Sequence, residues 1–147
     1  MPLNRYKNYL EDEVLDANPL QLIEMLYRGA LESIAAAKRH LRSRDIRARS
    51  VAISKAMAIV TELSLSLNHR EGGEISANLA ALYGYIEKLL IRANAEQCEP
   101  PLSEAEALLS TLLEGWSRSA GLQSASASAD RQGDCPAERR EAISCAY

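Results

Sequence analysis

The chain has 147 residues, which is long enough for one domain with a hydrophobic core and too short for two. Hydrophobic residues make up 47% of it and charged residues 25%, as is typical of soluble globular proteins. The formal net charge of −3 gives no general reason to expect a nucleic-acid partner, and no window is apolar enough to predict insertion into a membrane.

Residues 1–17 are polar, with isolated apolar side chains that are too sparse for a core helix. We therefore expect an extended N-terminal arm, and we find no apolar stretch in it that could serve as a signal peptide.

The first predicted helix spans residues 19–43. Asn18 is a suitable N-cap, and Pro19 suits the first helical position because proline has no N–H to satisfy. Apolar residues then recur every three or four positions, which indicates one buried face.

The second predicted helix spans residues 46–69, with Asp45 as its cap. Residues 62–67 (ELSLSL) alternate apolar and polar side chains, as a strand would. We predict helix here because the neighbouring residues keep helical spacing and no second strand is available for pairing.

The third predicted helix spans residues 73–97 and follows a break at residues 68–73, which contain two adjacent glycines. Its apolar residues are spaced alternately by four and three, as in helices that pack at about 20° in four-helix bundles. The fourth, residues 103–119, opens on a capping box formed by Ser103 and Glu106 and contains the single tryptophan, Trp116.

Short connections make sequential helices antiparallel neighbours, so residues 18–120 are predicted to form an all-α, up-down-up-down four-helix bundle. Residues 121–147 are rich in serine, alanine and charge, and we expect a disordered tail.

The sequence offers little for catalysis or metal binding. His40 and His69 stand far apart without a metal-ligand pattern, and Cys98 has no neighbouring histidine. Cys135 and Cys145 fall in the tail, so the three cysteines do not form a disulfide framework and a reducing cytoplasm is the simplest expectation. We expect no enzyme, no catalytic residue, no metal and no cofactor.

Two sequence features leave alternatives open. Residues 38–49 are basic, which complements the helix dipole at the end of the first helix and would also suit an acidic partner. The second and third helices carry many alanines beside Met57, Tyr83 and Tyr85. Such positions either allow close helix packing or leave shallow apolar grooves for a partner's side chains.

Two longer strings carry a family resemblance. Residues 18–30 (NPLQLIEMLYRGA) resemble the first-helix signature of FliS, the flagellar secretion chaperone, which runs A-S-P-x-Q-L-I-x-M-L-Y-D-G-A. Residues 72–85 (GGEISANLAALYGY) resemble the family's G-G-E-I-A-x-N-L-x-x-L-Y-D-Y stretch. Arg28 and Gly84 stand where the family often has aspartate, and the tail has no counterpart in this pattern.

The resemblance implies an antiparallel α-bundle that acts in the cytoplasm as an export chaperone. Such a protein binds the disordered C-terminal segment of flagellin, prevents its premature polymerisation and delivers it to the flagellar type III export apparatus. The implied partners are that flagellin segment and components of the export gate, without nucleic acid or membrane insertion. Monomer and homodimer both remain open.

By the same resemblance, the partner-binding groove should come mainly from the second and third helices, with Tyr9 of the arm covering it. The predicted groove residues are Tyr9, Ile53, Met57, Val60, Leu67, Leu79, Tyr83 and Ile86. Several of them must also serve the core. The alternatives are a self-associating structural bundle that acts as a scaffold, an enzyme that uses Cys98 or His69, and a nucleic-acid binder that uses residues 38–49.

Overall fold

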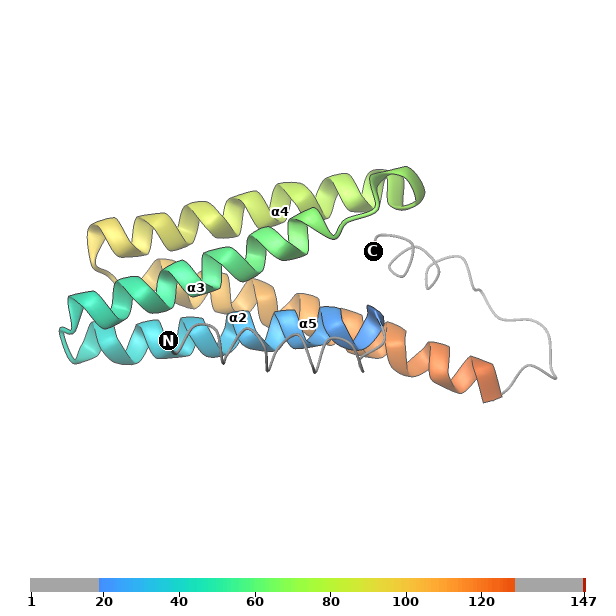
Figure 1. The fold of residues 1–147 in the computed structure, drawn as a ribbon, viewed down its shortest axis with the longest axis horizontal. Coiled ribbons are helices and arrows are strands. Elements are labelled where there is room, and N and C mark those ends of the chain that lie inside the picture. The colour runs from blue at the N-terminus through green and yellow to red at the C-terminus, as the bar shows by residue number, and fades with distance from the viewer. Residues whose placement is uncertain (1–18, 129–146) are drawn as a thin grey trace, which may run out of the picture.

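A computed structural model describes residues 19–128 and residue 147, with side chains described up to Ser119 in the last helix. The described chain forms four α-helices, which are α2 (Pro19–Arg42), α3 (Ile46–Leu65), α4 (His69–Glu96) and α5 (Pro100–Ser128). They run antiparallel and are joined by short turns (Figure 1). This confirms the predicted all-α bundle of four helices, whereas the predicted arm lies outside the described residues. None of the four helices is long and apolar enough to cross a membrane.

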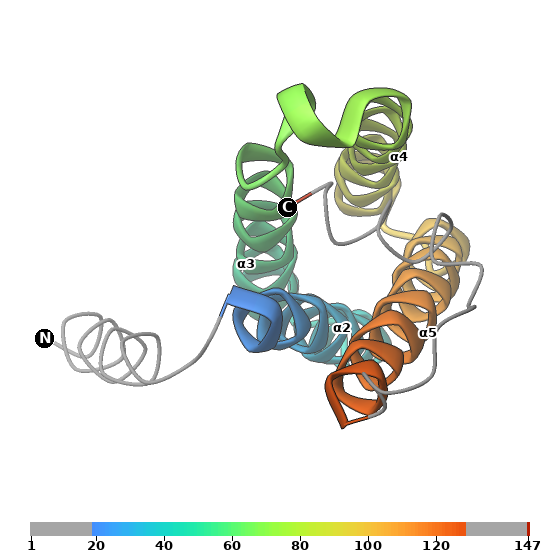
Figure 2. The same ribbon diagram turned by 90° about the vertical axis from the view of Figure 1, so that its right-hand side faces the viewer.

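The helices form a ring in chain order, and α5 closes the ring by packing against α2 (Figure 2). Each helix turns its apolar face inward, which removes that face from water and is the main stabilising contribution. One fully buried side chain from each helix illustrates the shared core: Ile34, Val60, Ile86 and Leu109. Alanines such as Ala30 and Ala56 are also fully buried, so at these positions the small residues serve close packing.

Helix α3 ends at Leu65, four residues before the predicted end at residue 69. The Ser66 side chain donates to the Glu62 carbonyl oxygen at 2.8 Å, and the chain then leaves the helix so that Asn68 can cap α4. The Asn68 side chain accepts the Glu71 N–H at 3.2 Å, as the Asp45 side chain accepts the Ala48 N–H at 3.1 Å for α3.

Helix α4 begins at His69 and contains a kink at Gly73, where the prediction began the helix. Gly73 has φ 51° and ψ −122°, a backbone conformation that residues with a Cβ rarely adopt. The kink turns the chain after one helical turn, and the Ser76 hydroxyl donates back across it to the Asn68 carbonyl oxygen at 3.0 Å. The predicted break at residues 68–73 therefore contains one helical turn, and the long part of α4 follows Gly73, where the sequence predicted the helix to begin.

Helix α5 begins at Pro100 instead of Ser103 and continues to Ser128 instead of residue 119. Proline is tolerated in the first turn of a helix, and the Ser103 N–H already donates to the Glu99 carbonyl oxygen at 3.1 Å. At the other end, α5 continues to Ser128, into the segment predicted as a disordered tail. Residues 129–146 of that tail lie outside the described residues.

Polar contacts close the end of the bundle that contains the α2–α3 and α4–α5 turns. Arg42 pairs with Glu99 at 2.6 Å, and Lys38 pairs with Glu106. The hydrogen bond from Arg42 lowers the pKa of the Glu99 carboxyl group. Buried Arg49 donates to the Asn94 side-chain oxygen at 3.3 Å, which joins α3 to α4. Thus three of the cations between residues 38 and 49 make contacts within the chain.

Replacing Gly73 by alanine should destabilise the bundle by about 1–3 kcal/mol, because the kink holds a positive φ that alanine adopts only with strain. Urea unfolding followed by circular dichroism measures the change.

Gly84 provides the matched control, since it lies inside the same helix and a Cβ there would meet nothing within 4 Å. Gly84→Ala should leave the bundle unchanged or more stable by up to about 1 kcal/mol, as helix propensity predicts. Equal effects of the two substitutions would contradict the assigned role of Gly73.

Candidate functional site

An apolar cleft of about 290 Å³ lies at the end of the bundle opposite the polar contacts. It opens between α2, α4 and α5, and its lining residues are Tyr27, Ile75, Asn78, Leu79, Leu82, Thr111, Leu112, Gly115, Trp116 and Tyr147. This volume lies near the lower limit of about 300 Å³ for small-molecule sites. The cleft is therefore suited to a few apolar side chains rather than to a large cofactor.

Two tyrosines from opposite corners of the ring lie at the floor of the site, where Tyr27 lines the cleft and Tyr83 lies behind it. The hydroxyl groups of Tyr27 in α2 and Tyr83 in α4 are hydrogen-bonded to each other, and the two side chains are 2% and 0% exposed. A buried hydroxyl without a partner would be costly, so each tyrosine satisfies the other. The strings at residues 18–30 and 72–85, which carry the family resemblance, thus meet in space through these two side chains.

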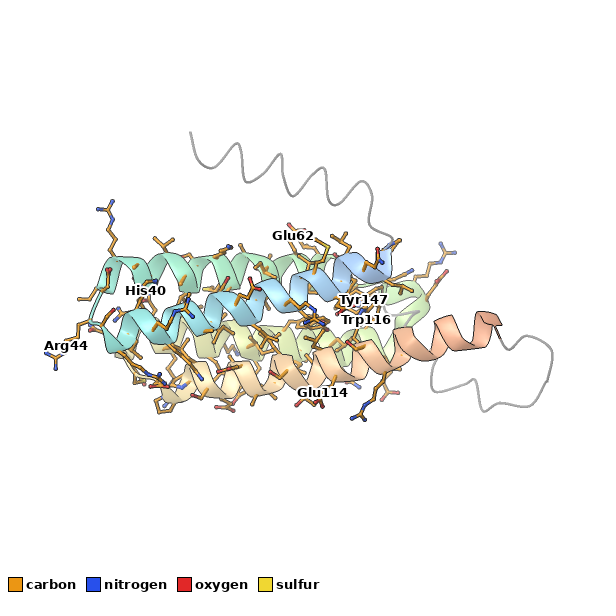
Figure 3. The ribbon with its side chains drawn as sticks, turned by 90° about the horizontal axis from the view of Figure 1, so that it is seen from below. His40, Arg44, Glu62, Glu114, Trp116 and Tyr147 are labelled. Carbon is orange, nitrogen blue, oxygen red and sulfur yellow. The ribbon has the colours of Figure 1, made fainter. Side chains whose placement is uncertain are left out.

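Trp116 joins α5 to the start of α2. Its indole Nε1 donates to the Leu20 carbonyl oxygen at 3.2 Å, and its side chain is 3% exposed. The ring of Tyr147 contacts it edge-to-face, with centroids 5.3 Å apart and planes at 78° (Figure 3). The Tyr147 hydroxyl lies 3.1 Å from that of Tyr27 and also bonds to that of Tyr83.

The lining of the cleft is uncharged at neutral pH. It contains no Lys, Arg, Asp, Glu or His, and its titratable groups are tyrosines. Burial raises the pKa of Tyr27 to about 12 and raises the pKa of Tyr147 as well. Such a site favours apolar and aromatic groups over ions, and it offers binding contacts rather than an acid, base or nucleophile.

The predicted groove residues divide between the cleft and the core. Leu79 lines the cleft, Tyr83 lies behind it, and Met57 is half-buried on the face of α3 that carries Ser50 and Thr61. The remaining described ones are core side chains that are at most 8% exposed: Ile53, Val60, Leu67 and Ile86. Tyr9 lies outside the described residues. A role of these residues in contacting a partner stays a prediction.

Sequence reasoning did not select Ile75, Leu82, Leu112, Trp116 or Tyr147 as site residues. The first four lie on the apolar faces of α4 and α5. Helical spacing shows that such side chains point inward, but it does not show whether they line a cleft or fill the core. No local signal placed Tyr147 near the bundle.

The residues considered for catalysis are not grouped. His40 and His69 lie at opposite ends of the bundle. Partial desolvation, together with the nearby Glu96 carboxylate, raises the pKa of the Cys98 thiol, which lowers its thiolate fraction. No group of three potential metal ligands occurs within the part of the chain that the structure describes, and Cys135 and Cys145 lie outside it.

Comparison with known proteins identifies one family. The family described as "Flagellar protein FliS" matches residues 2–123. The flagellar secretion chaperone FliS of Salmonella typhimurium is 39% identical over 108 residues, which cover 73% of this chain and 80% of that protein. FliSB of Pseudomonas aeruginosa is 36% identical over 73% of this chain and 85% of its own length, and FliS of Campylobacter jejuni is 36% identical over 76% and 87%.

The buried Tyr27 should make the bundle sensitive to alkali. Its pKa is raised from 10.0 to about 12, so its contribution to stability is complete below pH 10 and is lost as the pH rises towards 12. Tyr27→Phe should remove about 2 kcal/mol of the stability lost by the top of the measured pH range, because most of the effect of two pKa units is reached there.

Urea unfolding at a series of pH values between 9 and about 11.5 compares the two chains at the pH where tyrosine ionises. Tyr85→Phe is the comparison, because Tyr85 is 44% exposed and the variant retains Tyr27. The hydrogen bond to Glu104 also raises the pKa of Tyr85, so this variant measures the contribution of an exposed tyrosine beside that of the buried one. If the Tyr27→Phe variant loses as much stability at alkaline pH as the wild-type chain, the role assigned to Tyr27 is wrong.

Proposed function

The chain belongs to the FliS family of flagellar proteins, and from this membership we propose that it is a secretion chaperone for flagellin. In this proposal it acts in the cytoplasm, binds the disordered C-terminal segment of flagellin and prevents its premature polymerisation. It then delivers flagellin to the flagellar type III export apparatus, where components of the export gate are its further partners. This activity requires no catalytic residue and no cofactor.

The observation that carries the proposal is the cleft between α2, α4 and α5. Its walls include Leu79, Leu82 and Leu112, which are packed against the core and only partly buried, so apolar surface remains open to a partner. A disordered segment can bury apolar side chains there and fold as it binds. The neutral lining favours such a client over nucleic acid or a charged small molecule.

A client that wraps around the bundle needs more than one contact, and α3 offers a second apolar surface. Val51 and Leu65 are 65% and 74% exposed, and the exposed Ala58 lies between them at a spacing of seven residues, on nearly the same side of the helix. We include this stripe in the proposed flagellin contact, beside the half-buried Met57.

The same stripe supports the alternative of a self-associating scaffold, since exposed apolar stripes also join copies of a chain. Sedimentation of the purified protein with and without the flagellin segment separates the two functions. A chaperone forms a 1:1 complex with the segment, whereas a scaffold forms concentration-dependent oligomers that do not bind it.

Isothermal titration calorimetry against the C-terminal segment of flagellin from the same organism tests the proposed function. We expect 1:1 binding with a large negative heat-capacity change, because apolar surface is buried as the segment folds. Leu79→Ala should weaken the affinity about tenfold, which corresponds to the loss of an apolar contact of about 1.4 kcal/mol.

Leu41→Ala is the matched control, since Leu41 is also half-buried against the core but lies in the last turn of α2, at the closed end. It should leave the affinity unchanged. Absence of binding by the wild-type chain, or equal weakening by both variants, would count against the proposed site.

The proposed role of the arm is tested separately. Removal of residues 1–15, or the single change Tyr9→Ala in the full chain, should alter the affinity for the flagellin segment. Thermal unfolding should remain that of the intact protein, because the four helices are complete without these residues. An unchanged affinity in both variants would exclude the arm from the binding surface.

A further inference from the structure

Tyr147 lies in the cleft although it belongs to none of the four helices. The other nine lining residues come from α2, α4 and α5. Figure 2 shows the end of the chain inside the ring of helices, and Figure 3 shows Tyr147 beside Trp116. The family match ends at residue 123, so this contact is a feature of this chain beyond the matched region.

The side chain of Tyr147 makes the contacts expected of a bound aromatic ligand. Its ring meets the Trp116 ring edge-to-face at 5.3 Å, an arrangement that aromatic pairs prefer. Its hydroxyl group reaches the two tyrosine hydroxyls on the floor, those of Tyr27 and Tyr83. Together these contacts fit a phenol ring and leave its hydroxyl satisfied.

We propose that Tyr147 is an intramolecular occupant of an aromatic subsite in the cleft, and that an aromatic side chain of the client displaces it. The chemical class of the displacing group follows from the lining. A neutral, apolar pocket with an indole ring and the hydroxyls of Tyr27 and Tyr83 accepts tyrosine or phenylalanine and disfavours charged side chains.

The chain between α5 and Tyr147 is long enough for intramolecular occupancy. An extended chain from the end of α5 at Ser128 to Tyr147 can span about 60 Å, so tether length does not prevent entry into the cleft. Burial of the ring favours occupancy, whereas closing the loop costs entropy. These opposing contributions to the free energy have the same order of magnitude. Tyr147 therefore competes with a client because its tether gives it a high local concentration, but a client can still displace it.

Fluorescence of Trp116 tests the occupancy without any client. The chain contains one tryptophan, so its emission reports on this position alone. Tyr147→Ala should shift the emission to longer wavelength and raise the acrylamide quenching constant, because the indole loses the ring that covers it. Tyr147→Phe keeps the ring and should retain the wild-type emission.

A small-molecule rescue distinguishes an aromatic subsite from general loosening. N-acetyl-tyrosinamide, added to the Tyr147→Ala chain, should restore protection of Trp116, whereas N-acetyl-alaninamide should not. Equal quenching of the wild-type and Tyr147→Ala chains would overturn the proposal. Protection that rises with protein concentration would also overturn it, because Tyr147 would then enter the cleft of a second copy.

The competition between Tyr147 and the client rests on the proposed function, and calorimetry with the flagellin segment tests that part. If Tyr147 occupies the aromatic subsite of the cleft about nine-tenths of the time, Tyr147→Ala should bind the segment about tenfold more tightly than wild type or Tyr147→Phe. Equal affinities for all three chains would refute the competition. If none binds, the proposed function fails, while the Trp116 measurement still decides whether Tyr147 occupies the cleft.

Discussion

The hydrogen bond between Tyr27 and Tyr83 is the contact on which the open end of the bundle depends. The two residues lie on α2 and α4, which face each other across the ring, and both hydroxyl groups are removed from water. Because a buried hydroxyl without a partner is costly, the pair couples the two helices in one register. The two long aromatic side chains meet between α2 and α4 and fill the space between these helices at this level.

The separation of the helices at this end explains the cleft beside the tyrosine pair. Along α2 and α3, buried alanines such as Ala30, Ala37 and Ala56 allow close packing, and Gly29 leaves only 3.3 Å between a would-be Cβ and the Ile59 side chain. The ion pair of Arg42 and Glu99 joins the C-terminal end of α2 to the start of α5. Apolar surface therefore remains open at the opposite end, where the kinked α4 begins.

The character of the cleft favours a role in holding another polypeptide. Its neutral tyrosines and its leucines can bury apolar side chains of many sequences. Occupancy by Tyr147 fits the same character, because the subsite accepts an aromatic ring from either the chain itself or a client. Covering exposed apolar surface in this way also lowers the risk of aggregation in the empty protein.

The sequence alone determined that the chain is a bundle of four helices, because the spacing of apolar residues and a capping residue such as Asp45 are local signals. It also revealed the family, through two strings whose tyrosines are paired in the structure. It could not separate groove from core, since helical spacing shows which side chains point inward and not how far the facing helix lies. For that reason Ile53, Val60 and Ile86 were predicted together with Leu79, although only Leu79 of these four lines the cleft. The tertiary structure alone decided the position of Tyr147, because it depends on contacts between segments that are distant along the chain.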